Sequence, residues 1–271
     1  GVVTTLNPLY TPHEISSQLN DSKASVVVTT KALSDKAQEA AVMSGVQHII
    51  ILDAADADGS RDGVVHHSYS SVLAAGSAAD PLPAASIEPS DLAVLPYSSG
   101  TSGKSKGVVL THSNLITNIL QLDELGAAGP GDACLGLLPF FHIYGMVVVL
   151  NWALRSGCTV HTMPSFDPAL FLKLLPQLSV MHIAPPLAHF LAKHPAMEEV
   201  LPLPKLRDVI CAAAPLGSEL AQATKQRLGG RCAIRQGYGL TETSPAAIIA
   251  PPDVPDSRLD SVGKLLPNMR A

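Results

Sequence analysis

A regular alternation of short apolar segments with helical segments in the second half of the chain constrains the fold most. The predicted strands are Cys158–Thr162, Val180–Ala184, Val209–Ala213 and Cys232–Gln236. Three helices are predicted between these strands. The first begins at Asp167-Pro168, and the other two cover Pro186–Lys193 and Gly217–Leu228. Short apolar strands that alternate with helices are typical of a largely parallel sheet buried on both faces, so the fold class is layered α/β. Ligands of such sheets bind at the carboxyl ends of the strands, and we expect the last strand to end there in a glycine turn.

The first half of the chain alternates in the same way, with longer polar connections. Thr11-Pro12-His13-Glu14 supplies an N-cap, a first-turn proline and the glutamate of a capping box, which predicts a helix to about Asn20. Two stretches rich in Asp, Ala, Gly, Ser and Pro, Asp53–Gly63 and Gly76–Ser90, are expected to be surface connections. The other predicted elements are strands Ser25–Thr29, His48–Leu52, Leu92–Pro96 and Gly107–Leu110, and helices Leu33–Met43, Ser113–Leu125 and Ile143–Leu154.

Composition excludes two classes of protein. Apolar residues make up 46% of the 271 residues and charged residues only 15%, which excludes a largely disordered chain. Eighteen Lys and Arg against 23 Asp and Glu give a net charge of −5, so there is no basic face for a nucleic acid. The four cysteines are far apart with no C-x-x-C pair, which favours buried thiols in a reducing compartment, cytoplasmic or peroxisomal. No feature of the sequence bears on oligomeric state.

Leu135–Leu154 is the one stretch long enough to suggest a membrane span, because it has no charged residue over 20 positions. Glycine, proline and polar residues interrupt it, and no cationic flank precedes it, so we expect no span.

Ser98–Gly107 is rich in serine, threonine, glycine and lysine, which is the composition of a phosphate-binding loop. One interpretation is a P-loop NTPase, because Gly103-Lys104-Ser105 matches the end of its motif. Ser98 stands where that motif has its first glycine, and a strand rather than a helix is predicted to follow. A solvated surface loop is the remaining interpretation from composition alone.

Tyr97–His112, with the sequence YSSGTSGKSKGVVLTH, resembles the AMP-binding signature of the acyl-adenylate-forming superfamily. Ser102 and Ser105 stand where that signature usually has Thr and Pro, and Lys106 is at its lysine position. The resemblance implies that this loop holds the β- and γ-phosphates of ATP. The phosphate-binding residues it implies are Ser98, Ser99, Gly100, Thr101, Ser102, Gly103 and Lys106.

Three further segments in the expected order are similar to motifs of the same superfamily. Gln236–Pro245, which contains GYGLTET, resembles a motif in which the aromatic residue stacks on adenine, the threonine contacts the α-phosphate and the glutamate holds magnesium. Pro139–Gly145 resembles the segment whose histidine gates the acyl pocket, and Cys211–Gly217 resembles the adenine-side turn. The implied nucleotide contacts are Ala213, Ala214, Pro215, Gln236, Gly237, Tyr238, Gly239 and Thr241, the implied metal ligand is Glu242, and the implied acyl-side residues are His142, Tyr144, Ala213 and Gly237.

The resemblance is closest to the 4-coumarate–CoA ligase-like group and implies ATP-dependent activation of a carboxylic acid, with Mg²⁺, followed by transfer to CoA. Lys106, His142, Thr241 and Glu242 are the implied catalytic residues. Residues 1–271 would then be a fragment of the large domain, without the C-terminal lid domain, and we expect this chain to bind nucleotide but to adenylate poorly. A nucleotide-binding protein without catalytic activity is the alternative from a different class.

Overall fold

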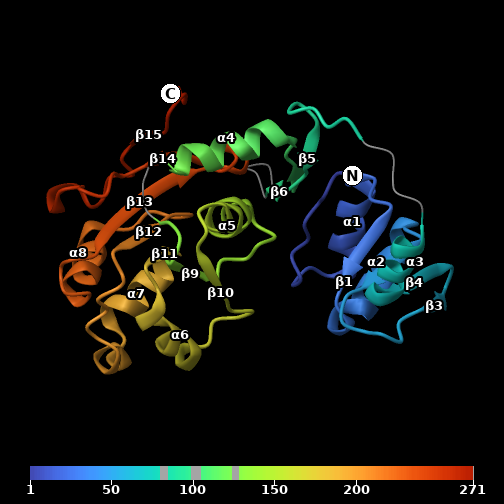
Figure 1. Cartoon of the computed structure of the whole chain (residues 1–271), viewed down its shortest axis with the longest axis horizontal. Coiled ribbons are helices and arrows are strands. Elements are labelled where there is room, and N and C mark those ends of the chain that lie inside the picture. The colour runs from blue at the N-terminus through green and yellow to red at the C-terminus, as the bar shows by residue number, and fades with distance from the viewer. Residues whose placement is uncertain (80–84, 99–104, 124–127, 271) are drawn as a thin grey trace. The chain divides into compact units, whose positions relative to one another are not determined.

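The computed structural model describes residues 1–79, 85–98, 105–123 and 128–270. It divides into two compact units, Gly1–Gly107 and Val108–Ala271, and each is described by itself (Figure 1).

The first unit is built on a four-stranded sheet with the order β1-β2-β4-β3, in which only β3 is antiparallel. Apolar residues of α1, α2 and one face of the sheet form its core. The predicted capping box is confirmed, because Thr11 and Glu14 exchange hydrogen bonds at the start of α1. The elements of this unit are α1 (Pro12–Ser22), β1 (Val26–Thr29), η1 (Lys31–Leu33), α2 (Ser34–Ser44), β2 (His48–Ile51), β3 (Gly59–Arg61), β4 (Val64–Ser68), α3 (Tyr69–Ala78), β5 (Leu92–Val94), β6 (Tyr97–Ser98) and β7 (Lys106–Gly107).

The second unit is built on a seven-stranded sheet with the order β10-β9-β11-β12-β13-β14-β15, parallel except at β14 and β15. Its helical and 3₁₀ elements are α4 (His112–Asp123), the π-helical segment η2 (Tyr144–Asn151), α5 (Trp152–Arg155), α6 (Pro168–Leu174), η3 (Leu175–Gln177), α7 (Pro185–Lys193), η4 (Pro195–Glu199), α8 (Ser218–Arg227), η5 (Thr241–Thr243) and η6 (Asp256–Arg258). Its strands are β8 (Leu110–Thr111), β9 (Ala133–Gly136), β10 (Thr159–Thr162), β11 (Val180–Ile183), β12 (Asp208–Cys211), β13 (Ala233–Gly239), β14 (Ala246–Ile249) and β15 (Lys264–Leu265).

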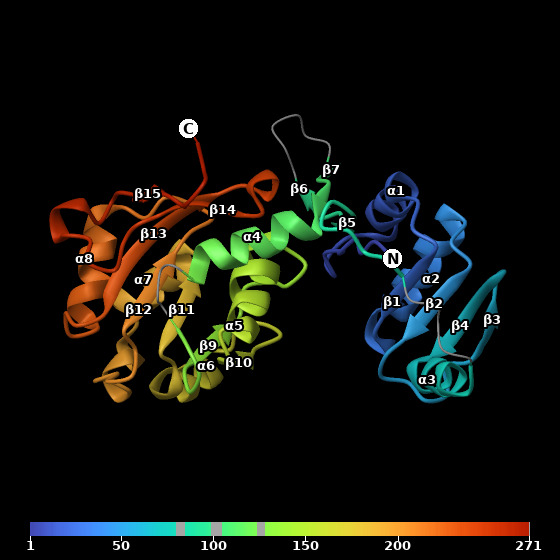
Figure 2. The same cartoon turned by 45° about the horizontal axis from the view of Figure 1, so that its top comes forward.

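Helices cover both faces of the seven-stranded sheet, as the apolar strands predict. The core on one face includes residues of α6, α7 and α8, and the core on the other face includes residues of α4, η2 and α5. Figure 2 shows α4 running beside β14, where Asn118 donates to the carbonyl oxygen of Ala246 at 2.8 Å.

The order of the strands creates a switch point between β9 and β11. The chain leaves β9 for β10 on one side and then returns to place β11 on the other side of β9. In open parallel sheets, ligands bind at the carboxyl ends of strands beside such a point. This position is therefore the place in the second unit where a site is expected.

Several predictions about individual elements are wrong. The strand predicted to end at Gln236 continues through Gly239, so the segment GYG is strand rather than turn. Gly107–Leu110 is not one strand, because Val108 and Val109 separate β7 from β8. The stretch Asp53–Gly63 contains β3, and the second predicted connection overlaps the end of α3. β4, β9, β14 and β15 were not predicted.

The predicted helix Ile143–Leu154 is helical, but most of it is the π-helical η2 rather than α-helix. Within the described ranges, no helix has both the length and the apolar character needed to cross a bilayer.

Candidate nucleotide and acyl site

The adenine-side turn follows β12, next to β13. Cys211 pairs with Gln236 in the parallel register, and a Cβ placed on Gly237 would lie 3.8 Å from the Cβ of Ala212. The following residues Ala213, Ala214 and Pro215 are exposed. The structure therefore brings two motifs together that are about 20 residues apart in the sequence, at the carboxyl end of β12.

Ala213 has the unusual backbone conformation in this turn, with a φ of 73°. The left-handed region favours glycine, so a β-carbon there carries strain. The strain falls one position after Ala212, the first residue beyond β12. The backbone is held in this shape by its surroundings rather than by the preference of the residue.

Gln236 fastens the turn to β13. Its amide oxygen accepts from the Leu216 N–H at 2.9 Å, and its amide nitrogen donates to the carbonyl oxygens of Leu216 at 2.8 Å and Leu259 at 2.7 Å. The side chain is buried and its amide is bonded to backbone, so Gln236 shapes the site as a scaffold residue.

Beyond Gln236, β13 changes its neighbour and becomes exposed. Gly237 and Tyr238 pair antiparallel with β14, and Tyr238 is 49% exposed. An exposed aromatic ring on a rigid strand offers a flat surface for a base. Only glycine fits at position 239, because a Cβ there would lie 2.0 Å from the carbonyl oxygen of Pro245.

A tight turn places Thr241 and Glu242 just after this exposed end. The backbone N–H of Leu240 donates to the carbonyl oxygen of Pro245 at 3.1 Å, and the hydroxyl of Thr243 also donates to that oxygen. Thr241 is nearly buried at the start of η5, while Glu242 is exposed. A carboxylate oxygen is a donor type that Mg²⁺ takes, so Glu242 fits the metal role that the resemblance implies.

His142 and Tyr144 follow β9, on the switch-point side of the sheet. Tyr144 is buried, and its hydroxyl donates to the carbonyl oxygen of Ile210 in β12 at 3.3 Å. Tyr144 also shares a core cluster with Ala212, which precedes the adenine-side turn. The structure therefore brings Tyr144 and the start of the adenine-side turn together around β12.

The tautomer of His142 follows from its hydrogen bond. The backbone N–H of Tyr144 donates to Nδ1 of His142 at 3.2 Å, so Nδ1 is the acceptor and a neutral ring carries its proton on Nε2. Partial burial of the ring lowers the pKa of His142, which favours this neutral form. Nε2–H is thus a candidate hydrogen-bond donor.

Sequence reasoning did not single out His182, which lies deep beside the acyl-side candidates. It is 2% exposed, and its ring is 6.1 Å from that of Tyr144 and 5.4 Å from that of Trp152, measured between ring centroids. Within the described part of the chain, neither ring nitrogen has a hydrogen-bond partner. Burial lowers the pKa of His182 to about 3, so the ring is neutral at physiological pH. The only sequence feature that could have pointed to His182 is that it is a single histidine within an otherwise apolar predicted strand.

Arg235 and Asp208 form a buried ion pair that sequence reasoning also missed. Nε of Arg235 donates to Asp208 at 2.9 Å, a second guanidinium nitrogen bonds the other carboxylate oxygen, and a third donates to the carbonyl oxygen of Ala250. The two side chains are 0% and 7% exposed. Burial raises the pKa of Asp208, and Arg235 only partly offsets this effect.

The phosphate-loop candidates belong to the first unit. Ser98 and Lys106 pair across the β6–β7 hairpin. The remaining candidates of this loop lie outside the described residues; they are Ser99, Gly100, Thr101, Ser102 and Gly103. Because strand β7 follows Ser105, the helix that a P-loop NTPase requires is not there, and that interpretation is wrong.

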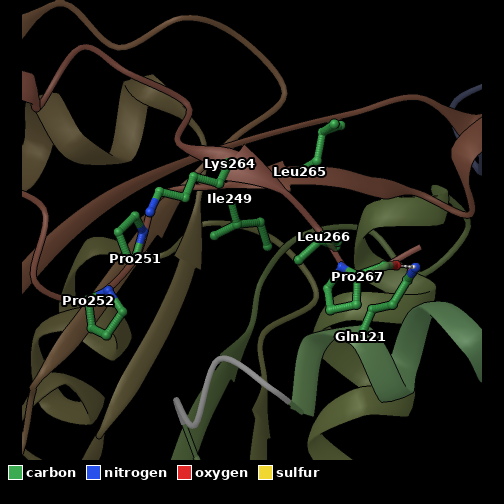
Figure 3. Close-up of a pocket in the computed structure, with 8 residues that line it drawn as sticks. All are labelled: Gln121, Ile249, Pro251, Pro252, Lys264, Leu265, Leu266 and Pro267. Atoms are coloured by element: carbon green, nitrogen blue, oxygen red, sulfur yellow. Dashed lines mark hydrogen bonds between the residues drawn. The ribbon is translucent and has the colours of Figure 1, made fainter. Parts of the chain in front are cut away.

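A pocket of about 260 Å³ lies elsewhere in the second unit, between α4 and the β14–β15 edge (Figure 3). Its wall is mainly apolar, with Ile249, Leu266 and prolines, and Gln121 and Lys264 are its polar members. None of the predicted site residues lines it, but Ile249 in its wall is the register partner of Gly237, so the pocket lies beside the candidate site rather than within it.

Comparison with known proteins agrees with the motifs. The AMP-binding enzyme family matches residues 1–271, and the chain belongs to this family. It is 35% identical over 286 residues to a probable 4-coumarate–CoA ligase 1 of Dictyostelium discoideum, covering 100% of this chain and 51% of that protein. It is 37% identical to 4-coumarate–CoA ligase 3 of rice (Oryza sativa subsp. japonica), covering 90% of this chain and 43% of that protein.

The solved structures give the same fold. ATP-bound MatB from Rhodopseudomonas palustris superposes with a TM-score of 0.78 at 28% identity, over 98% of this chain and 50% of that one. The chain thus spans about half the length of the relatives it matches.

Proposed function

We propose that this chain binds ATP and activates a carboxylic acid as an acyl-adenylate, as part of an acyl-CoA ligase that then forms the CoA thioester. The carboxylate oxygen attacks the α-phosphorus, the bond to the bridging oxygen breaks, and pyrophosphate leaves. In the second step the CoA thiol attacks the acyl carbon and AMP leaves. Family membership supports this activity, as do the names of the relatives.

The observation that carries the proposal is the arrangement at the ends of β12 and β13. An exposed turn follows β12, and an exposed aromatic residue and a threonine–glutamate pair follow the parallel part of the neighbouring strand β13. In our proposal Tyr238 stacks on the adenine beside the turn at Ala213, and Thr241 binds the α-phosphate. Such fixed groups act mainly by positioning the reactants and stabilising phosphoryl charge.

Two further roles follow from the chemistry of the side chains. Glu242 would hold Mg²⁺, which when bound supplies positive charge against the phosphates. Lys106 would supply a second positive charge to the β- and γ-phosphates, with the hydroxyl groups of the same loop.

On the acyl side, Nε2–H of His142 would donate to the carboxylate, and Tyr144 would line the pocket. A 4-coumarate-like acid is the substrate class that the relatives' names support, and a fatty acid is the alternative. We place the protein in a reducing compartment, cytoplasmic or peroxisomal, and the four free, buried cysteines support this placement.

The test is thermal stabilisation by a non-hydrolysable coumaroyl-AMP or fatty-acyl-AMP analogue, with ATP·Mg and GTP·Mg as controls. A ligand that binds only the folded state raises the unfolding temperature by mass action. We expect a clear shift with the acyl-AMP analogue and with ATP·Mg but not with GTP·Mg, and at least a tenfold weaker affinity for the analogue in Thr241→Ala.

Thr162→Ala is the matched control, because Thr162 is exposed on β10 at the opposite edge of the sheet. Absence of any shift with the acyl-AMP analogue would contradict acyl activation. Because poor adenylation is expected of residues 1–271, the non-catalytic alternative would be favoured by a clear shift with ATP·Mg together with no shift for any acyl-AMP analogue.

A further inference from the structure

The β6–β7 hairpin of the first unit fixes the position of Lys106. Tyr97 pairs with Gly107 and Ser98 pairs with Lys106, so two ladder positions join the strands on either side of residues 99–104. The hydroxyl of Ser105 also donates to the carbonyl oxygen of Ser98 at 3.2 Å. The position of this short hairpin therefore determines the position of the Lys106 backbone.

Tyr97 ties the hairpin to a helix that is remote in the sequence. Its hydroxyl donates to Oδ2 of Asp21 in α1 at 2.5 Å, across 76 residues. A hydroxyl bound to a carboxylate at this length is a strong, charge-assisted hydrogen bond. Partial burial, together with Asp21, raises the pKa of Tyr97 well above its usual value, so the hydroxyl remains a donor at neutral pH.

The ring of Tyr97 also packs against the backbone of the opposite strand. A Cβ added to Gly107 would lie 3.1 Å from two atoms of the ring, closer than ordinary van der Waals contact. Gly107 therefore leaves room for the ring to lie flat across the hairpin and reach α1. The residue before Gly107 is Lys106, so the ring contact and the lysine share one backbone segment.

Asp21 does not stabilise the helix in which it lies. It is in the last turn of α1, where a negative charge opposes the helix dipole, and this turn contains no basic residue. Its carboxylate is exposed, and Tyr97 is the group that it binds. The bond to the hairpin is thus the structural use of this side chain.

We propose that Tyr97 and Asp21 are positioning residues for the triphosphate end of ATP. They anchor the β6–β7 hairpin to α1 and so fix the backbone that carries Lys106. This inference rests on the proposed function, because it assumes that Lys106 meets the β- and γ-phosphates. A small displacement of a charged group from its partner weakens binding strongly, so the loss of the anchor acts on ATP although neither residue touches it.

The test compares ATP·Mg with AMP, which lacks the β- and γ-phosphates, by isothermal titration calorimetry. Tyr97→Phe keeps the ring and removes only the hydroxyl. We expect its dissociation constant for ATP·Mg to rise about tenfold, while that for AMP stays within about twofold. Tyr69→Phe is the matched control, because Tyr69 is an exposed tyrosine on α3 of the same unit.

Asp21 provides the rescue and a double-mutant cycle. Asp21→Asn keeps an acceptor oxygen and should stay within about threefold of the unaltered chain, whereas Asp21→Ala should match Tyr97→Phe. If the two residues act through one bond, Tyr97→Phe with Asp21→Ala weakens ATP·Mg binding about tenfold rather than about a hundredfold. Melting temperatures of all variants exclude a general loss of fold.

The outcomes separate the two proposals. If the unaltered chain binds ATP·Mg and Tyr97→Phe binds it equally well, the positioning role is overturned and the proposed function stands. An equal loss for ATP·Mg and AMP would also overturn it, because the bond would then serve the fold alone. If the unaltered chain binds neither nucleotide, the proposed function fails and the positioning role fails with it.

Discussion

Two adjacent rows of side chains on the seven-stranded sheet differ in chemistry although they are one residue apart. Met181, Val209 and Ile234 are in register across β11, β12 and β13 and belong to the core beneath α6, α7 and α8. The next row, on the opposite face, is His182, Ile210 and Arg235. The first row is wholly apolar, while the second buries two ionisable groups.

Buried ionisable groups oppose stability unless they are paired, so the second row is not a simple core. It lies on the face covered by α4, η2 and α5, and the Tyr144 hydroxyl bonds to the backbone of its middle residue. Tyr144, one of the acyl-side candidates, is on this face too. One face of the sheet is therefore stabilised by apolar packing. The other face buries ionisable groups near the candidate site, which costs stability.

The largest expected difference between the two rows lies in how the free energy of unfolding depends on pH. The pKa of His182 is lowered to about 3 in the folded state, so between pH 6.5 and 3 the unfolded chain binds the extra proton. Stability therefore falls as pH falls through this window, by up to about 5 kcal/mol. His182→Leu should remove this part of the slope in urea unfolding measured from pH 6.5 to 4.

His189→Gln, at an exposed position on α7, should keep the full slope and serves as the control. An unchanged slope in His182→Leu would show that this buried histidine is not the source of the acid sensitivity.

Breaking the buried ion pair is expected to have the next largest effect. Arg235→Met leaves Asp208 buried without its partner, which should reduce the free energy of unfolding by about 3–5 kcal/mol. Arg235→Met combined with Asp208→Leu should be clearly more stable than the single variant, because no charge is then left unpaired.

In the apolar row, Ile234→Val should lower the free energy of unfolding by only about 0.5–1.5 kcal/mol. The difference between the two faces would disappear if this change matched Arg235→Met in urea unfolding.

The smallest expected effect concerns the strained turn. Ala213→Gly removes a β-carbon from a residue with positive φ, so stability should rise by about 0.5 kcal/mol after the entropy of the unfolded chain is counted. Ala214→Gly, at a neighbour without this conformation, should lower stability by a similar amount. Thermal unfolding of the two variants measures whether their changes in stability are opposite in sign. Changes of the same sign would argue against strain at Ala213.

Much of the fold was predictable because strand and helix periodicities are local. The predicted strands β10 to β12 and the helices α7 and α8 agree with the structure within one or two residues at each end. β9 was missed because Ala133–Gly136 is short and lies in a stretch rich in alanine and glycine. The glycines of GYG suggested a turn, but at Gly239 the requirement is close approach of the Pro245 carbonyl within a continuing strand.

The site was predictable only where short strings of residues carry it. The motifs named the expected adenine-side turn, Tyr238, Thr241 and Glu242 as candidates without any knowledge of packing, and their roles stay predictions. The row that holds His182 and Arg235 depends on the register of β11, β12 and β13, and the Tyr97–Asp21 bond joins residues 76 apart. Such long-range pairing is decided by tertiary packing, which no single segment of the sequence records.

Strand β13 belongs to the core at one end and to the candidate site at the other. Its residues up to Gln236 pair with buried β12, and Gly237–Gly239 then pair with β14, with a shift of register between Tyr238 and Gly239, while the strand itself continues. The backbone around Tyr238, the candidate for stacking on adenine, is therefore held by strand pairing, so binding a base there would cost little entropy for ordering the backbone. Amide protons of this segment should exchange with solvent about as slowly as those of the sheet, since opening the site means opening the core.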